Sequence, residues 1–504
     1  MSHTFPIALR RNTWHNSYRI EIVIVPIDNK ITTKITVPIF PTFTAWNAWL
    51  DDLGLFQIDL GLSRISAALD TLELRRSTPA SVQVVGTNGK GSTAAFLDAL
   101  GRAHGRRTGL FTSPHLISVR ERIQVNGCRV SETAWLKLVE RCHSTALALS
   151  LTYFEYLTLL AAAAFAGHDV ELAIWESGLG GRWDATTALA RDLVCITPID
   201  LDHQAVLGDS VAAIAWDKIG ALTNGSVIVP GIAGPQSTEI AALIAVAAAN
   251  GTTLQEATAI VELETLDPGS TVTGFIPGPA APPGFPTAVR PRRLGLAGPH
   301  QWHNSQLALA SFSNLATAHG WPLSAAACAA GLETAFIPGR LQIVPGRPAA
   351  FPDLILDGGH NPHGLTALAA ALATEGLRPA AVIFTCLQDK PLEWLASLIA
   401  GLTPGPILVP ELTRLPRARP AATVAKACGD RGLPVTDMAT ALQATLDLTQ
   451  KINAEAGKRP NPVLLCGSLF LLAEFFRIYP DLLEPPTGKN NALPKNDCIT
   501  AKLT

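Results

Sequence analysis

The sequence predicts an α/β protein in which a larger domain with a mostly parallel sheet is followed by a smaller α/β domain. Several apolar runs end in glycine-bearing turns, and residues with helical apolar spacing follow them. That alternation is typical of parallel sheets covered by helices on both faces. The chain has 504 residues, which is more than one hydrophobic core usually organises, so at least two domains are expected.

The predicted strands follow one another along the chain. The first is the run SVQVVG at residues 81–86, and helical spacing follows it at residues 92–105. Further buried strands are predicted within residues 108–115, 170–178 and 192–200. After residue 340 the alternation restarts, with strand–turn units at residues 352–364, 380–390, 405–412 and 461–476. Ligands of such sheets gather at the carboxyl ends of the strands, so polar residues there are site candidates.

Composition shifts give the expected domain boundaries. We expect the first domain at residues 41–330 and the second at residues 331–484. The Pro- and Gly-rich stretch 267–291 cannot hold a regular helix, and we interpret it as a surface excursion of the first domain. Residues 1–40 form an extension of unassigned role, and the polar tail at residues 485–504 is predicted to be disordered.

The composition excludes several classes of protein. Hydrophobic residues make up 48% of the chain and charged residues 16%, with a net charge of −2, so no basic excess indicates nucleic acid as a partner. The eight cysteines contain no C-x-x-C pair, which argues against a zinc site or a disulfide framework and fits a reducing cytoplasm. Mean hydropathy is +0.25. Even so, apolar runs such as residues 157–167 are shorter than the roughly 18–20 residues of a membrane span.

The stretch GTNGKGS at residues 86–92 is a candidate phosphate loop of an unusual form. It departs from G-x-x-x-x-G-K-[ST], because Val84 stands at the first glycine position and Gly91 follows Lys90. Glycines allow backbone N–H groups to converge on an anion, and a helix N-terminus adds a favourable dipole. Lys90 would supply positive charge to the β- and γ-phosphates. A nucleotide phosphate site is therefore favoured over a plain glycine-rich turn.

Polar residues follow two further predicted strands. Glu176 begins ESGLGGRWDATT, and a carboxylate beside a glycine-rich turn suits Mg²⁺, with Arg182 and Asp184 placed to orient a second substrate. The alternative is a solvated turn with an incidental acid. His203 in DLDHQ has the same placement, and the alternative there is a histidine that only makes structural hydrogen bonds.

Two more candidates come from the second half of the chain and from a helix. Lys218 in VAAIAWDKIGA has the composition of an ordinary surface lysine. Asp357, His360 and Asn361 crowd the turn DGGHNPHG, and a fold-supporting turn does not need both an acid and a histidine. The sequence has no G-x-S-x-G nucleophile elbow.

Nine motifs occur in an order that resembles a known family. They are GTNGKGST, TSPHL (112–116), FEYLT (154–158), E-x-GLGGRxDATT (176–187), LDHQ-x-x-LG (201–208), HQ-x-x-N (300–304), PGR (338–340), DGxHNPHG (357–364) and CGSLFLLAE (466–474). Together they resemble the folylpolyglutamate synthase/dihydrofolate synthase family of the Mur-ligase superfamily, from about residue 45 to residue 476. The G-K-G-S form favours this branch over the cell-wall amino-acid ligases.

The resemblance implies a Mur-ligase-like fold, with a P-loop-type ATPase domain, a glutamate-ligase domain and an active site in the cleft between them. It implies a cytoplasmic, monomeric ATP-dependent ligase of folate biosynthesis. The expected substrates are ATP, L-glutamate and either dihydropteroate or folates, and the reaction would pass through an acyl phosphate. Two Mg²⁺ ions and a K⁺ ion are the implied cofactors. Whether one or both acids are used stays open.

The resemblance also assigns residues. ATP contacts fall on Thr87, Asn88, Gly89, Lys90, Gly91, Ser92, Asn304, Arg340 and Asp357. Mg²⁺-binding positions fall on Ser113, Glu176, His203 and Lys218, the last as a carbamate. The pterin substrate would contact Ile58, Asp59, Leu60, Phe154 and Asp184. Catalytic roles are implied for Lys90, His203, Lys218 and His360.

The chain departs from the family pattern at two places. It has WDKIG at residues 216–220 where REKAG is common, and Gly359 where alanine is usual. Two rival interpretations remain beside the folate ligase. One is a related Mur-type ligase that acts on another carboxylate, and the other is a non-catalytic ATP-binding module.

Overall fold

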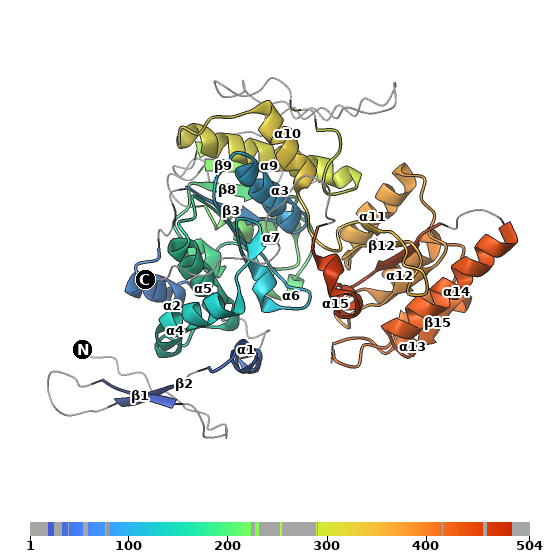
Figure 1. Ribbon diagram of the computed structural model, residues 1–504, viewed down its shortest axis with the longest axis horizontal. Helices are drawn as coiled ribbons and strands as arrows, with labels where there is room; N and C mark the ends of the chain where they lie inside the picture. The colour runs from blue at the N-terminus through green and yellow to red at the C-terminus, as the bar shows by residue number, and fades with distance from the viewer. Residues whose placement is uncertain are drawn as a thin grey trace.

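The computed structural model describes most of the chain (Figure 1). The described residues are 19–24, 33–38, 40–53, 59–75, 78, 80–222, 227–230, 253–254, 289, 291–415, 417–456 and 461–485. Three expectations lie wholly or mostly outside them: the substrate contact at Ile58, the excursion at residues 267–291 and the tail beyond residue 485. Within residues 1–40, the strands β1 (Arg19–Ile24) and β2 (Thr33–Pro38) form an antiparallel pair.

The larger sheet has eight strands in the order β10-β9-β8-β3-β7-β4-β5-β6. Its strands are β3 (Ala80–Val85), β4 (Thr108–Phe111), β5 (Ile123–Val125), β6 (Cys128–Arg129), β7 (Leu172–Glu176), β8 (Leu193–Ile196), β9 (Val227–Pro230) and β10 (Thr253–Leu254). All neighbours from β10 to β4 are parallel, and only β5 and β6 run antiparallel. The predicted mostly parallel sheet is confirmed.

Helices cover both faces of this sheet (Figure 1). On one face α3 (Lys90–Ala103) packs with α9 (Pro299–Ala318) and α10 (Ala325–Thr334). The other face carries α1 (Phe43–Asp52), α2 (Ser63–Thr71), α4 (Glu132–Ala148) and α5 (Tyr153–Gly167). The apolar run noted at residues 157–167 lies in α5, whose residues are almost all buried between the sheet and its neighbours. Among the described helices, none is long and apolar enough to cross a membrane.

The smaller sheet has six strands in the order β11-β12-β16-β13-β14-β15, of which only β11 is antiparallel. These are β11 (Gln342–Val344), β12 (Leu354–Leu356), β13 (Val382–Phe384), β14 (Ile407–Pro410), β15 (Gly432–Val435) and β16 (Val463–Cys466). One face packs on α11 (Pro362–Thr374), α12 (Leu392–Leu402) and α13 (Ala421–Ala427), the other on α14 (Met438–Ala456) and α15 (Leu469–Ile478). Alternate residues face the two cores, such as Leu464 and Leu465.

The contacts between the two halves include an apolar contact and an ion pair. Leu116 and Ile117, in the loop after β4, pack against the core that α15 forms with the smaller sheet. Near them, a guanidinium nitrogen of Arg129 lies 2.6 Å from a carboxylate oxygen of Glu484. The first contact removes apolar surface from water, which is the main favourable term in such association. The second is largely exposed and contributes little.

Replacing Leu464 by alanine tests the centre of the smaller sheet. Leu464 is fully buried on β16, between β12 and β13. Leu464→Ala should destabilise by roughly 2–5 kcal/mol, since it removes buried methyl groups and leaves a cavity. The matched control is Leu433→Ala on the edge strand β15, where the side chain is 47% exposed. The measurement is the urea midpoint of the unfolding transition by circular dichroism. Equal shifts for both variants would contradict the placement of β16.

Candidate active site

The phosphate loop joins β3 to α3, and its glycines are required by backbone geometry. Gly89 precedes the first helical residue with φ of +85°, and a Cβ atom there would lie 2.5 Å from Asn304 Oδ1. Gly86 has φ of +147°, and its Cβ would lie 1.9 Å from Thr197 Oγ1. The first turn of α3 has neither a side-chain cap nor an acid. Its N–H groups and dipole are therefore free to face an anion.

Two predicted ATP contacts hold the loop in shape. The Thr87 N–H donates to Pro198 O at 3.0 Å, and the Asn88 N–H donates to the same oxygen at 3.3 Å. The Thr87 hydroxyl donates to Asp200 O at 3.0 Å. These two N–H groups are already used within the protein. The anion-facing N–H groups are consequently those from Gly89 onward, in the first turn of α3.

Two lysines converge on the loop from different elements. Lys90 Nζ donates to the carbonyls of Gly86 and Thr87, both at 3.1 Å. Lys218, in α7 (Val211–Ile219), donates from Nζ to Gly86 O at 2.8 Å. Lys218 is only 4% exposed, so its composition-based interpretation as a surface lysine is wrong. Burial, and next the charge of Lys90, lower the pKa of Lys218 to about 7. Burial also lowers the pKa of Lys90, against the opposing charge of Glu176.

Glu176 and Ser113, two predicted metal ligands, lie side by side. Glu176 ends β7, is 5% exposed, and accepts the Ser113 N–H at 2.9 Å on Oε2. A Cβ atom on Gly91 would lie 3.4 Å from Glu176 Oε1, so the carboxylate is beside the first turn of α3. Burial raises the pKa of Glu176, while Lys90 acts in the opposite direction. A cation here would replace the solvation that Glu176 lacks.

His203 and Asp202 form the next wall of the site. His203 has φ of +52° and precedes α6 (Gln204–Leu207), and its N–H donates to Asp202 Oδ1 at 2.9 Å. Asp202 is also contacted by Lys390, whose Nζ lies 3.2 Å from Oδ1. Burial alone would raise the pKa of Asp202, but His203 and Lys390 together hold it at about 2. The carboxylate is therefore ionised.

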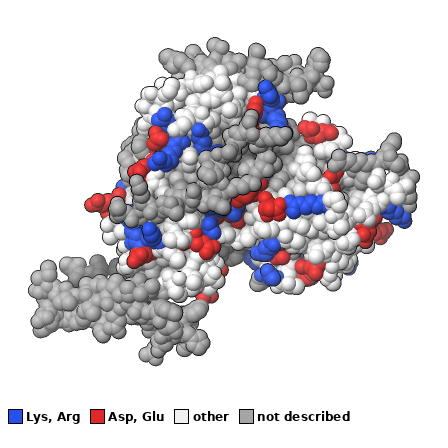
Figure 2. All heavy atoms as spheres, in the orientation of Figure 1, with Lys and Arg blue, Asp and Glu red and all other residues white. Residues whose placement is uncertain are grey.

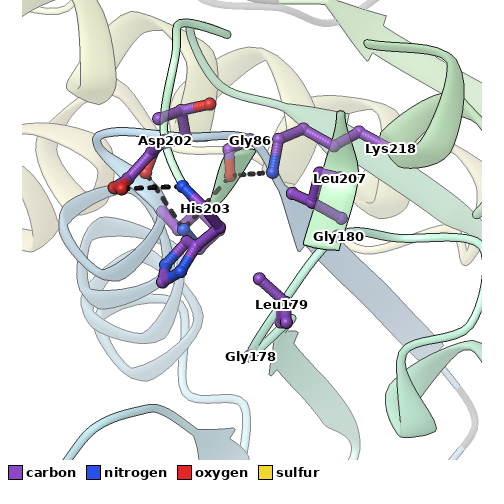
Figure 3. Close-up of a pocket in the computed structure, with 10 residues that line it drawn as sticks. Gly86, Gly178, Leu179, Gly180, Asp202, His203, Leu207 and Lys218 are labelled. Atoms are coloured by element: carbon purple, nitrogen blue, oxygen red, sulfur yellow. Dashed lines mark hydrogen bonds between the residues drawn. The ribbon is translucent and has the colours of Figure 1, made fainter. Parts of the chain in front are cut away.

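One pocket joins these residues at the carboxyl ends of β3, β7 and β8 (Figure 3). Its lining is Gly86, Thr87, Lys90, Gly178, Leu179, Gly180, Asp202, His203, Leu207 and Lys218. Basic and acidic side chains are interspersed on the face of the molecule in Figure 2. Within the described residues no three His, Cys, Asp or Glu side chains form a metal cluster. Mg²⁺ is commonly bound by one or two protein carboxylates, with phosphate and water completing its shell.

The smaller sheet contributes the turn that follows β12. Asp357, 7% exposed, accepts the N–H groups of Leu341 at 2.9 Å and Gly359 at 2.8 Å, so it ties the PGR loop to this turn. Asn361 Nδ2 donates to Asn88 Oδ1 at 3.4 Å and to Asp202 Oδ2 at 3.2 Å. The turn thus reaches the phosphate loop and the pocket wall.

His360 and Arg340 belong to the same corner. His360 Nδ1 lies 2.8 Å from Gly358 O, so in the neutral ring Nδ1 carries the proton and Nε2 is the basic nitrogen. Burial lowers the pKa of His360, which keeps the ring neutral near pH 7. A Cβ atom on Gly358 would lie 3.3 Å from an Arg340 guanidinium nitrogen. Asn304, 4% exposed in α9, faces Gly89 from the opposite side and donates to Gln301 Oε1 at 3.0 Å.

The predicted substrate contacts fall into two groups. Asp184 is 5% exposed, and its carboxylate accepts the N–H groups of Gly178, Leu179 and Thr186 at 2.8, 3.0 and 3.0 Å. Those bonds make it the support of the glycine loop. Phe154 packs against Gly178, where a Cβ atom would lie 2.7 Å from its ring.

The second group is at the surface. Asp59 lies 2.8 Å from an Arg64 guanidinium nitrogen, and Leu60 is 53% exposed. Neither residue lines the pocket described above.

The residues that depart from the family pattern have definite partners. Asp217 Oδ1 accepts the Gly181 N–H at 2.9 Å, and a Cβ atom on Gly181 would lie 2.4 Å from Lys218 O. The Arg182 guanidinium lies 5.3 Å from the centre of the Trp216 ring. The WDKIG segment therefore still anchors the glycine loop to α7 next to Lys218.

Sequence reasoning missed Asp202, Leu207 and Lys390. Asp202 precedes His203 in DLDHQ, where the histidine is the stronger chemical signal. Lys390 follows β13 in LQDK, so the rule that polar residues gather after parallel strands could have found it. Leu207 carries no chemical signal in the sequence.

Comparison with known proteins gives consistent matches. Residues 339–469 match the family described as Mur ligase, glutamate ligase domain. The dihydrofolate synthase/folylpolyglutamate synthase of Mycobacterium tuberculosis is 32% identical over 428 residues, which cover 80% of this chain and 85% of that protein.

Two solved structures carry ligands. Escherichia coli FolC in complex with DHPP and ADP has a TM-score of 0.69 and 27% identity, with 87% of this chain and 98% of that chain covered. The bifunctional folylpolyglutamate synthase/dihydrofolate synthase of Yersinia pestis, complexed with AMPPNP and a Mn ion, has a TM-score of 0.67 and 28% identity, with the same coverages of 87% and 98%. Nucleotide and a divalent cation are thus bound by proteins of this fold.

Gly89→Ala tests the phosphate loop. The added Cβ atom would meet Asn304 and strain a left-handed backbone, so the affinity for Mg·ATP should fall at least about tenfold, or roughly 1.4 kcal/mol. Gly105→Ala is the matched control, since Gly105 has φ of +72° with nothing within 4 Å of its Cβ position. Both variants bear similar backbone strain, and isothermal titration calorimetry should separate them. Equal affinities would exclude the loop as the nucleotide site.

Proposed function

The chain belongs to the dihydrofolate synthase/folylpolyglutamate synthase family, and we propose that the residues around its phosphate loop carry out glutamate ligation. The protein is an ATP-dependent ligase that joins L-glutamate to dihydropteroate or to folates. The observation that supports our assignment of residues is the convergence of Lys90, Lys218 and the first turn of α3 on one pocket. The family relation argues against a ligase for another carboxylate.

In the first step the phosphate loop holds the triphosphate. The N–H groups from Gly89 to Ser92 and the ammonium of Lys90 neutralise the phosphate oxygens, which is the main contribution of the protein in phosphoryl transfer. A carboxylate oxygen of the acid substrate attacks the γ-phosphorus, ADP leaves, and an acyl phosphate forms. Glu176, Ser113 and His203 would hold Mg²⁺, which neutralises charge on the phosphates when bound.

In the second step the amine of L-glutamate attacks the acyl carbon, phosphate leaves, and the amine loses a proton. We assign the proton acceptor as His360, because its ring is neutral near pH 7 and its Nε2 is the basic nitrogen. The turn that carries His360 lies against the phosphate loop through Asn361. This arrangement keeps water from the acyl phosphate.

Lys218 fits a carbamate in this proposal. A pKa of about 7 leaves a large share of its amine neutral at physiological pH, and only the neutral amine attacks CO₂. The ammonium first loses one proton to give the neutral amine, and formation of the N–C bond with CO₂ releases a second proton, so that a cation becomes an anion. Supporting observations are its 4% exposure and its place in the pocket beside Lys90.

Two coarser assignments complete the proposal. We assign residues 41–330 to nucleotide binding and residues 331–484 to glutamate ligation, since the glutamate ligase match at residues 339–469 lies within the second range. A cytoplasmic location agrees with the six buried cysteines that the structure describes, which are free thiols.

Phosphate release from Mg·ATP tests the reaction. With L-glutamate, release should occur with dihydropteroate, with a reduced folate, or with both, and the pattern decides which acids are substrates. Lys90→Ala should lower the rate at least about 100-fold, because a preorganised charge on the phosphates is lost. The control is omission of L-glutamate. If a folded protein that binds ATP released no phosphate with either acid, the assignment would be overturned.

Carbamylation of Lys218 predicts a pH dependence. The neutral amine increases as pH rises through about 7, so ¹³C-carbamate formed from labelled bicarbonate should increase from pH 6 to pH 8. The measurement is ¹³C NMR of the folded protein. Lys218→Arg should show no such signal, because arginine stays protonated. An identical signal in that variant would assign the carbamate to another amine.

A further inference from the structure

One acidic side chain lines a pocket that otherwise suits an anion. Asp202 shares the lining with Lys90 and Lys218, and its carboxylate forms an ion pair with Lys390. A nucleoside triphosphate carries several negative charges, so an unpaired carboxylate in this position repels it. The side chain of Asp202 is 13% exposed, so water screens this repulsion only weakly.

The charge that balances Asp202 comes from the other half of the chain. Lys390, between β13 and α12 of the smaller sheet, places Nζ 3.2 Å from Asp202 Oδ1, and its side chain is 12% exposed. Asp389 also contacts Lys390, at 3.6 Å, but Asp389 has its own cation in Arg417, at 3.2 Å. Lys390 is therefore the partner that the smaller sheet supplies to Asp202.

A second contact crosses the same junction. Asn361 Nδ2 lies 3.2 Å from Asp202 Oδ2 and 3.4 Å from Asn88 Oδ1, so both carboxylate oxygens of Asp202 have partners on the smaller sheet. Other contacts between the halves include those of Leu116 and Ile117, the Arg129–Glu484 ion pair and the packing of α9 against α11. The contacts at Asp202 bring the smaller sheet to a residue that lines the pocket.

We propose that Lys390 is a positioning residue that neutralises Asp202 and thereby couples the approach of the smaller sheet to triphosphate binding. With Lys390 in place, Asp202 is paired and the ammonium of Lys90 is left to face the phosphates. Without it, Asp202 offsets Lys90. Thermodynamic linkage makes this coupling reciprocal. If the Lys390–Asp202 contact increases the affinity for the triphosphate by some factor, bound triphosphate increases the equilibrium constant for the contact by the same factor. The proposal rests on the assignment of the loop to ATP.

The Lys390–Asp202 pair could act as a structural link or as a charge neutraliser, and the two roles predict different results. If the pair only ties the two halves together, losing either partner weakens nucleotide binding, and losing both is no better than losing one. If Lys390 neutralises Asp202, removing the carboxylate in a chain that already lacks Lys390 restores binding. Asp202→Asn keeps a carbonyl oxygen that can accept the His203 N–H, so the hydrogen bond within the loop is retained.

The experiment is a double-mutant cycle on Mg·ATP binding by isothermal titration calorimetry, without acid substrate. Lys390→Met should raise the Kd about 10- to 100-fold, and Lys390→Arg should stay near wild type. Adding Asp202→Asn to Lys390→Met should recover at least half of that loss on a logarithmic scale. Arg129→Ala, which breaks the ion pair away from the pocket, should leave the Kd unchanged.

The outcomes separate this inference from the proposed function. A wild-type protein that does not bind Mg·ATP contradicts the nucleotide assignment itself. A wild type that binds, together with a Lys390→Met variant of equal affinity, contradicts the coupling alone. If the Asp202→Asn/Lys390→Met double variant binds Mg·ATP no better than Lys390→Met, the ion pair has only a structural role and the proposal is contradicted.

Discussion

The register between three parallel strands is the constraint on which the site depends. Val84 of β3 pairs with Glu176 on β7 and with Cys195 on β8, so the three strands end at one level. The phosphate loop, the Glu176 carboxylate and the segment that carries Asp202 consequently leave the sheet together. A slip of one residue in β7 would turn Glu176 to the opposite face. Side chains far apart in sequence thus meet because backbone hydrogen bonds align the strand ends.

That alignment concentrates buried charge, which the protein stabilises with backbone groups. Lys90 and Lys218 donate to carbonyls of the loop, and Glu176 accepts the Ser113 N–H. Asp184 accepts three N–H groups of its own loop. Buried ionised groups persist when they are hydrogen-bonded in this way. The conformation of the loop is therefore held by hydrogen bonds within the protein.

Local patterns predicted the sheets and most strand-end residues, because both follow from periodicity and turn chemistry. They could not predict that Lys218 is buried, since this depends on Gly181 approaching the backbone of α7. Nor could they predict that Asp184 supports a loop, because its neighbours are backbone N–H groups without a sequence signature. The pairing of Lys390 with Asp202 depends on how two separate sheets adjoin, and no local pattern encodes that placement.

Division of the site between two sheets has an electrostatic consequence. A pocket of fixed positive charge attracts the product diphosphate as well as the substrate, because both are polyanions. A pocket whose wall includes Asp202 changes its net charge when Lys390 approaches or withdraws. Asp202 repels a polyanion when Lys390 is withdrawn, and its charge is neutralised when Lys390 is paired with it. The fold therefore places the negative charge of Asp202 on one side of the junction and the positive charge of Lys390 on the other. The distance between these two charges changes the affinity for the nucleotide.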